Sequence, residues 1–320
     1  MQKIVRFGII GCGAHARKSF IPALAKSNCA ELTVIASRYE NKARGYAKEY
    51  GCDYVASYEE LAVHPEVDAI YIATPNGMHA NNIKLAAEGG KHVLCEKPLT
   101  ESLETTIKSV EYCRLHNVAL MEGFAYQYHQ KHQVFQELLD SGEIGEPVLF
   151  HAKFGFPPLK SSYRYDPVLG GGALLDAGAY TVHSARKILQ SEPINVFAVL
   201  NNKNKEVDIQ GSVLLEFRDK KTAQLAFGFD NYYQNTYSVW GSKGKATVYR
   251  AFSSPHELVS AILVETQEGS KEIEVEPCDQ FMREIEIFVG GIYNESEKNA
   301  WYKDAINQAE VLHNIRLYSR

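Results

Sequence analysis

The sequence predicts an α/β protein that begins with a doubly wound parallel sheet and continues with a second α/β domain containing a large, mostly antiparallel open sheet. Three observations predict this order. Apolar runs alternate with helical stretches up to about residue 124, a glycine-rich turn follows the first run, and strand patterns dominate the chain after about residue 142. Continuous apolar strands alternating with helices are typical of a parallel sheet covered on both faces.

The first half of the chain supplies the parallel strands. Helical stretches separate the apolar runs, and one of these helices begins near Leu103. At roughly 100–200 residues per domain, a chain of 320 residues indicates two domains, and we place their boundary near residue 123. The predicted strands cover residues 4–10, 32–37, 54–57, 67–74, 91–98 and 117–124.

The second half, residues 124–320, changes pattern. The stretch KHQVFQELLDSGEIG predicts a helix that ends at Gly142, because glycine is common just after a helix. Turn signals such as RDKK and GSKGK then separate strand patterns, which predicts an antiparallel sheet, and helix returns from about Phe281. The predicted strands are PVLFHAKFGF, NVFAVLN, GSVLLEF, TAQLAFGF, TYSVWG and KATVYR.

Composition and charge exclude several classes of protein. The net charge is −5 and no run of lysine or arginine stands out, which argues against a nucleic-acid partner. The first residues lack a secretory signal pattern, and no apolar run approaches the roughly 20 residues that cross a membrane. Six scattered cysteines form no CxxC pair, so we expect a soluble protein of the reducing cytoplasm.

A phosphate-binding turn follows the first strand. The stretch 11–16, GCGAHA, matches G-x-G-x-x-G/A and opens a helix. Gly11 permits the tight turn, Gly13 lets the backbone approach a pyrophosphate, and the helix N-terminus offers free N–H groups to the phosphates. The strand–turn–helix context predicts a dinucleotide site that includes Cys12, Ala14 and His15.

The end of the second strand bears on which dinucleotide binds. Binding of NAD commonly uses an acidic residue there, whereas this chain has Ser37 and Arg38. A hydroxyl and a guanidinium suit a 2′-phosphate. We therefore expect NADP(H), with NAD(H) as the alternative if Glu40, two residues further on, takes the acidic role.

Two more polar stretches end neighbouring strands at the same sheet edge, where ligands bind in such sheets. Glu96 and Lys97 precede Pro98, which favours an extended backbone at Lys97. The stretch TPNGMH ends the preceding strand. Its predicted contributors to the nicotinamide side of the cofactor site are Thr74, Pro75, Asn76 and His79.

The phosphate turn, TPNxxH, EKP and GGGxLxDxGxY together resemble the Gfo/Idh/MocA oxidoreductase family, along essentially the whole chain. The resemblance implies a dinucleotide-binding Rossmann domain over residues 1–123 and a substrate-binding and oligomerisation domain over residues 124–320. It also implies a small carbohydrate substrate and a homodimer or homotetramer formed through the C-terminal sheet.

Many members of that family have histidine where this chain has Tyr180. Tyrosine there is similar to nucleotide-sugar C-3 ketoreductases, dimeric dihydrodiol dehydrogenase and glucose-fructose oxidoreductase. The stretches at 161–174 and 232–255 resemble the sugar-ketoreductase pattern most.

Asp176, Tyr180 and His183 have the spacing of one helix face. Periodicity alone would make this face the solvent side of an amphipathic helix, whereas the resemblance makes it the reacting face. Tyr180 is then the proton donor in reduction and Lys97 the ammonium that lowers its pKa from about 10. Asp176 would position Lys97, Tyr180 or a substrate hydroxyl.

Further residues would contact substrate or form the pocket walls, although packing and surface roles fit them equally well. His129 and His132 are three apart, but no carboxylate or cysteine has matching spacing, so we expect no metal. The residues in this wider set are Tyr126, His129, Tyr163, Arg164, Asp166 and His183.

Three functions compete at this point. The first is NADP(H)-dependent hydride transfer to a nucleotide-activated keto-deoxysugar, at C-3. The second is oxidation of a free sugar, a polyol or a trans-dihydrodiol with the same lysine and tyrosine. The third is a cofactor-binding regulator without turnover, which the intact Lys97, Asp176 and Tyr180 argue against.

Overall fold

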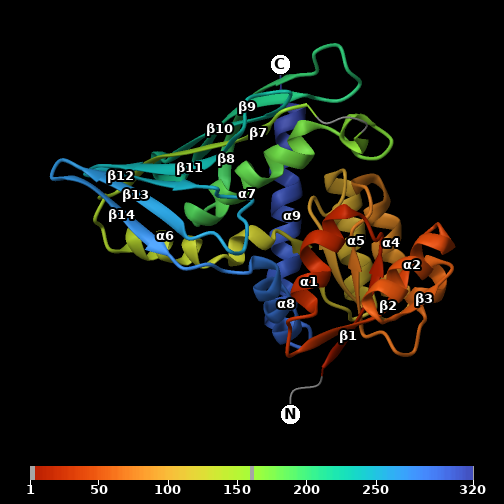
Figure 1. Cartoon of the computed structure of the whole chain (residues 1–320). Coiled ribbons are helices and arrows are strands. Elements are labelled where there is room, and N and C mark those ends of the chain that lie inside the picture. Colours follow the sequence, from red (N-terminus) through yellow and green to blue (C-terminus); the bar gives the residue numbers. More distant parts are fainter. Residues whose placement is uncertain (1–3, 159–161, 320) are drawn as a thin grey trace. The chain divides into compact units, whose positions relative to one another are not determined.

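The computed structural model describes residues 4–158 and 162–319, and the chain folds as two compact units (Figure 1). One unit extends to Phe124 and includes Phe281–Ala309, and the other contains Ala125–Gln280 and the residues from Glu310 onward. The predicted fold class is confirmed: the first unit has a parallel sheet and the second a larger, mostly antiparallel sheet. The functional division at residues 123 and 124 stays a prediction.

The parallel sheet has the strand order β3-β2-β1-β4-β5-β6 among the described residues. Its central strands β1 and β4 are buried except at Arg6, since helices pack on them, and this explains their continuous apolar runs. The strands are β1 (Val5–Ile10), β2 (Ala30–Ala36), β3 (Asp53–Val55), β4 (Ala69–Ile72), β5 (His92–Glu96) and β6 (Leu120–Gly123).

The helices between these strands begin where the sequence supplies caps. Ser57 and Ser102 accept hydrogen bonds from the backbone N–H groups of Glu60 and Thr105, which satisfies donors at the starts of α3 and α5. The helices are α1 (Ile21–Leu24), α2 (Glu40–Tyr50), α3 (Tyr58–Ala62), α4 (His79–Glu88) and α5 (Leu103–Leu115).

Two late helices belong largely to the first unit, although the predicted second domain included them. They are α8 (Gln280–Gly291) and α9 (Glu295–Leu317), and α9 continues past Ala309 into the second unit. Phe288 packs its ring 5.8 Å from that of Phe7 on β1, and Tyr302 lies in the core under the parallel sheet. Burial of these apolar side chains explains why the segment returns to the first unit.

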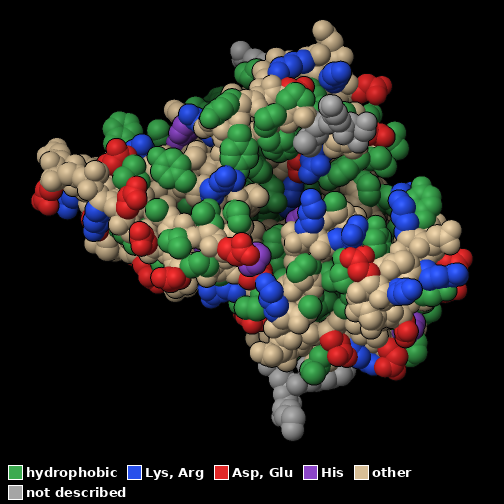
Figure 2. All heavy atoms as spheres, in the orientation of Figure 1, with side chains coloured by type: hydrophobic (Ala, Val, Ile, Leu, Met, Phe, Trp, Pro, Cys, Tyr) green, Lys and Arg blue, Asp and Glu red, His purple; other side chains and the backbone are tan. Residues whose placement is uncertain are grey.

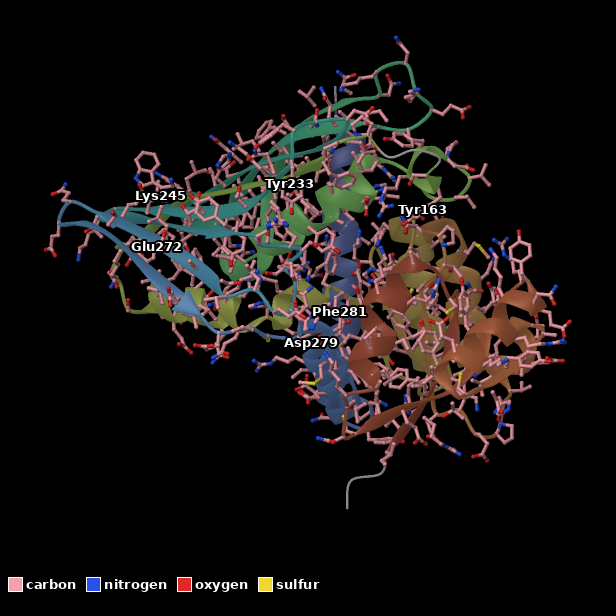
Figure 3. All side chains as sticks on the ribbon, viewed as in Figure 1. Tyr163, Tyr233, Lys245, Glu272, Asp279 and Phe281 are labelled. Carbon is pink, nitrogen blue, oxygen red and sulfur yellow. The ribbon has the colours of Figure 1, made fainter. Side chains whose placement is uncertain are left out.

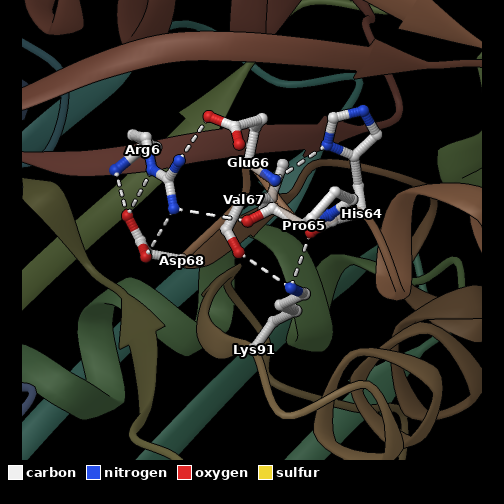
Figure 4. Close-up of polar contacts among 7 residues, drawn as sticks. All are labelled: Arg6, His64, Pro65, Glu66, Val67, Asp68 and Lys91. Carbon is white, nitrogen blue, oxygen red and sulfur yellow. Dashed lines mark hydrogen bonds and ion pairs between the residues drawn. The ribbon is translucent and has the colours of Figure 1, made fainter.

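A polar network closes the amino ends of β1 and β4 (Figure 4). Arg6 donates to Asp68 from its side chain and from its backbone N–H, and Lys91 donates to the carbonyl oxygens of His64 and Val67. These residues fix the end of the sheet opposite the carboxyl edge. The carboxyl edge is where open parallel sheets bind ligands.

The second unit contains an eight-stranded sheet among its described residues, in the order β14-β13-β12-β11-β7-β10-β9-β8. The pairs are antiparallel except β10 with β7. The hairpin β13–β14 was not predicted, because the exposed side chains of β14 are mostly charged and hide its alternation. The strands are β7 (Pro147–Phe156), β8 (Pro193–Asn201), β9 (Gln210–Phe217), β10 (Thr222–Phe229), β11 (Gln234–Gly241), β12 (Gly244–Tyr249), β13 (Ser260–Thr266) and β14 (Gly269–Val275).

One face of this sheet is covered by α6 (Gln130–Asp140) and α7 (Ala179–Ile188) (Figure 1). The predicted stop of the first of these helices is confirmed, since Gly142 has φ +72° and its N–H donates to Leu139. On the opposite face of the sheet, which these two helices do not cover, strand pairing places exposed side chains next to one another. Its exposed apolar residues include Phe197, Val199, Leu214, Trp240 and Tyr249.

The sequence predicts neither a nucleic-acid partner nor a membrane partner, and two structural observations are relevant to these predictions. Basic and acidic side chains are interspersed on the face shown in Figure 2. Within the described residues, no helix has both the length and the hydropathy that a membrane crossing requires.

Candidate active site

The first part of the site is the turn after β1. Gly11 has φ +87°, and a Cβ there would lie 2.8 Å from the Thr74 side chain and 2.9 Å from the Ala73 carbonyl oxygen. Only glycine allows this turn so close to the end of β4. A Cβ at Gly13 would meet nothing within 4 Å, so the backbone is open to an approaching pyrophosphate. The residues present therefore fit a dinucleotide.

The residues of this turn differ in how exposed they are to solvent. Gly13, Ala14 and His15 are exposed, as a ligand-binding turn requires. The half-buried Cys12 is a poor nucleophile, because burial raises the pKa of its thiol to about 11. Cys12 therefore contributes to the turn through its backbone rather than through its thiol.

Glu96 connects this turn to the end of β5. Its carboxylate lies 3.0 Å from His15 Nε2 and accepts a hydrogen bond of 2.6 Å from the Tyr71 hydroxyl. Burial favours the neutral carboxyl, but the charge and hydrogen bond of His15 and the bond from Tyr71 hold the pKa of Glu96 below its ordinary value. A negative charge is thus fixed directly before Lys97.

His79, predicted near the nicotinamide, is fully buried and joins two loops. Its Nε2 lies 2.8 Å from the carbonyl oxygen of Thr74, and its Nδ1 lies 3.0 Å from that of Pro98. A neutral imidazole has a single N–H, so it can donate to one of these oxygens at a time. Burial lowers the pKa of His79, and the two carbonyl groups oppose that shift. The structure shows that His79 ties the TPN loop to the loop that carries Lys97.

Thr74 and Asn76 are also buried, at 8% and 5% exposure, while Pro75 is half-buried. The Thr74 hydroxyl accepts a hydrogen bond of 3.1 Å from Asn82. The sequence did not single out Asn82, which comes from α4 and supports the loop from behind. A contact of these residues with nicotinamide stays a prediction.

The end of β2 presents Arg38 at an exposed position. The Ser37 hydroxyl accepts a hydrogen bond of 3.2 Å from the Tyr39 backbone. Glu40, the acidic alternative for an NAD ribose, is paired instead with Arg44 at 2.6 Å on the same helix. Which of these two side chains reads the cofactor ribose stays a prediction.

The second part of the site is built on the glycine run in the second unit. Gly171 and Gly172 donate backbone hydrogen bonds of 2.9 Å to the carbonyl oxygens of Asp166 and Arg164. A Cβ at Gly171 would lie 2.5 Å from the Arg164 carbonyl oxygen. Because these glycines have no Cβ, the loop around Arg164 can pack directly on them.

Asp208, which the sequence analysis missed, holds the other side of this run. Its carboxylate accepts a hydrogen bond of 2.6 Å from the Leu174 backbone, and a Cβ at Gly172 would lie 2.5 Å from its Oδ1. Gly172 also has φ +116°. Asp208 lies 36 residues beyond Gly172 (208 − 172), and no local pattern connects the two.

The helix after the glycines differs from the expected one. Leu174–Gly178 is a π-helical turn, and the α-helix begins only at Ala179. The predicted α-helical spacing between Asp176 and Tyr180 is wrong for this reason. The solvent-face alternative is also wrong, since Asp176 is 7% exposed and His183 is 1% exposed.

Asp176 forms a charge pair with Arg164. Burial of Arg164 opposes its charge, but Asp176 raises the pKa of the guanidinium above its ordinary value, and Tyr163 and Tyr180 contribute in the same direction. Tyr180 thus lies within the electrostatic reach of the Arg164 guanidinium. Figure 3 labels Tyr163, whose ring lies 5.1 Å from the guanidinium.

Tyr180 is half-buried among three aromatic rings. The ring centroids of Phe154, Tyr126 and Phe252 lie 5.3, 5.7 and 5.7 Å from its own. Such a cage restricts the orientation of the phenol ring. Phe154 and Phe252 come from β7 and from the loop after β12, and the sequence analysis named neither.

The other predicted substrate residues differ in burial. Tyr126 and His183 are 3% and 1% exposed and share a hydrogen bond of 2.7 Å. His129, at 1% exposure, caps α6 by accepting from the Lys131 backbone. Tyr163, Arg164, Asp166 and Tyr180 keep exposed surface. Direct substrate contact by any of them stays a prediction, as does the absence of a metal.

Comparison with known proteins matches both units. Residues 5–124 match a family described as an oxidoreductase family with an NAD-binding Rossmann fold, and residues 132–247 match the GFO/IDH/MocA C-terminal domain. A dTDP-3,4-didehydro-2,6-dideoxy-alpha-D-glucose 3-reductase of Saccharopolyspora spinosa is 39% identical over 295 residues, covering 91% of this chain and 89% of its own. The chain belongs to the GFO/IDH/MocA oxidoreductase family.

Other members of this family show the range of similarity. The NADP-dependent D-xylose 1-dehydrogenase 2 of Haloferax volcanii is 35% identical over 89% of this chain and 88% of its own length. The 3-ketoreductase KijD10 of Actinomadura kijaniata, solved with NADP and TDP-benzene, has a TM-score of 0.95 at 33% identity. That match covers 99% of this chain and 98% of KijD10.

Proposed function

We propose that this member of the family reduces the C-3 keto group of a nucleotide-activated deoxysugar with NADPH. The observation that carries the proposal is the 39% identity with a dTDP-sugar 3-reductase over 91% of the chain. The solved relative at a TM-score of 0.95 holds NADP together with a TDP compound, which supports the same cofactor and substrate class.

The chain's own residues would perform the proton chemistry. A nicotinamide cofactor, when bound at the glycine turn, supplies the hydride for the carbonyl carbon. Tyr180 gives its phenolic proton to the carbonyl oxygen, so that an alcohol forms, and water later restores that proton. Arg164, held by Asp176, stabilises the phenolate left on Tyr180, and Lys97 assists the transfer.

The predicted oligomer and compartment belong to the same proposal. The open face of the eight-stranded sheet carries exposed apolar side chains such as Phe197 and Trp240, which suits a homodimer or homotetramer formed there. All six cysteines are free thiols, which suits the cytoplasm.

The test is a fluorescence titration with NADPH and NADH, repeated with a panel of dTDP- and UDP-sugars and followed by assay of NADPH consumption. We expect NADPH to bind more tightly than NADH and a dTDP-keto-deoxysugar to be reduced. Turnover of free sugars alone would favour a sugar dehydrogenase, for which the Haloferax relative is the precedent. Cofactor binding without turnover of any sugar, polyol or dihydrodiol would favour the regulator.

Replacing Arg38 with alanine is expected to weaken NADPH binding about tenfold or more and to leave NADH binding nearly unchanged. A hydrogen bond to a charged group contributes roughly 1.5–3 kcal/mol, and only NADPH has the 2′-phosphate that would receive it. The dissociation constants of both cofactors provide the measurement. Lys48→Ala, at an exposed position of α2, is the control. Equal losses for NADPH and NADH in Arg38→Ala would show that Arg38 does not read the 2′-phosphate.

A further inference from the structure

Lys131 is a lysine that the proposed mechanism does not use, and it is fully buried. It lies in the first turn of α6, where the helix dipole disfavours a cation. Burial lowers the pKa of its amine to about 7, with Arg250 acting in the same direction and Cys278 against it. Lysines are rarely buried without a specific partner. The role of Lys131 therefore depends on the group to which its amine donates.

The Lys131 amine donates a hydrogen bond of 2.6 Å to the carbonyl oxygen of Arg250. Arg250 directly follows β12 and has φ +50°, a conformation that arginine adopts only when its surroundings fix it. The start of α6 thus holds the backbone at residue 250, and we call residues 250 and 251 the β12 turn.

Asn235 on β11 anchors the β12 turn from a second side, because its carbonyl oxygen accepts a hydrogen bond of 3.2 Å from the Ala251 backbone, and its side chain holds the two residues that follow the turn. Its Oδ1 accepts a hydrogen bond of 2.8 Å from the Phe252 backbone, and its Nδ2 donates to Ser253 and to the Tyr233 hydroxyl. The Arg250 side chain also donates to that hydroxyl, and Figure 3 labels Tyr233 near the start of β11. The turn is held rigidly, with Lys131 as its anchor from the helix layer.

The contacts of Lys131 and Asn235 fix the position of Phe252. Its ring centroid lies 5.7 Å from that of Tyr180, 5.4 Å from that of Tyr126 and 5.2 Å from that of Phe154. Phe252 is therefore part of the aromatic cage around the proposed proton donor. A shift of the β12 turn would move one wall of that cage.

We propose that Lys131 is a positioning residue, which sets the orientation of Tyr180 by holding the β12 turn and Phe252. This inference rests on the role of Tyr180 in the proposed function. The Lys131 side chain is fully buried, so a direct contact with substrate or cofactor is no part of the proposed role. It acts through the Arg250 carbonyl oxygen, then the backbone to Phe252, and then the ring contact with Tyr180.

The first test follows catalysis in Lys131→Met, which keeps an unbranched apolar stem one atom shorter than that of lysine but removes the donor. We expect kcat to fall about tenfold with little change in KM for NADPH, because small misplacements of a reacting group are costly. In the Tyr180→Phe background the same change should cost less than about twofold, since its route to the chemistry is already lost. Lys245→Met, at an exposed position of β12 (Figure 3), is the control. Full additivity of the two losses would overturn the proposal.

The second test needs no substrate and so separates this inference from the proposed function. In protein with ¹³C-labelled tyrosine, the Tyr180 ring signal is the one that disappears in Tyr180→Phe. We expect Phe252→Leu to shift this signal, because the neighbouring ring is removed, and Lys131→Met to shift it as well. An unchanged Tyr180 signal in folded Lys131→Met would overturn the inference even if a sugar is reduced. A shifted signal would support it even if no tested sugar is reduced.

Discussion

Replacing Tyr180 with phenylalanine is expected to reduce turnover at least about 100-fold and to leave NADPH binding unchanged. General acid catalysis contributes roughly 10²–10⁴ in rate, and phenylalanine keeps the ring but has no proton to give. The ring contacts with Phe154 and Phe252 should survive, so the fold and the cage remain. The glycine turn that would hold the cofactor lies in the other unit, far along the chain.

The measurement combines steady-state rates with NADPH titration of the same preparations. Tyr293→Phe, a change at a tyrosine that is 64% exposed, serves as the matched control and should keep full activity. If Tyr180→Phe turns over at the wild-type rate, another group supplies the proton. If it loses NADPH affinity, the residue has a binding role that the proposal does not include.

The sequence was sufficient for elements with strong local patterns. The turn after β1, the continuous apolar strands of the first sheet, the alternating strands of the second and the stop at Gly142 were all predictable, because each depends on residues next to one another. The hairpin β13–β14 was missed because charged side chains mask its period. The return of α8 to the first unit was missed because it depends on packing with Phe7, which is distant in sequence.

The site was predictable as a set of residues but not as an arrangement. Asp176, Tyr180 and Arg164 could be named from the sequence. The pairing of Asp176 with Arg164 and the π-helical turn that contains Asp176 follow no local sequence pattern. Asp208 and Lys131 could not be found, because an aspartate in a loop and a lysine in a polar stretch ordinarily face water. Their roles arise from long-range contacts with Leu174 and Arg250.

Replacing Asp176 with asparagine is expected to lower both stability and turnover, for separable reasons. Asparagine keeps the size of the side chain but removes the charge that compensates the Arg164 guanidinium. Breaking a fully buried pair costs roughly 3–5 kcal/mol, and because Arg164 remains 30% exposed we expect a loss of about 2 kcal/mol in the free energy of unfolding. Turnover should fall at least about tenfold, since Arg164 no longer has a fixed place beside Tyr180.

The double variant Asp176→Asn/Arg164→Met separates the two effects. Removing the guanidinium also removes the uncompensated charge, so urea unfolding should show much of the lost stability restored. Turnover should stay low, because the cation that stabilises the Tyr180 phenolate is gone. Glu104→Gln, which breaks the exposed pair with Lys108, should leave the free energy of unfolding nearly unchanged. Recovery of turnover together with stability would mean that the pair matters only for folding, and the cation acting on Tyr180 would then have to be Lys97.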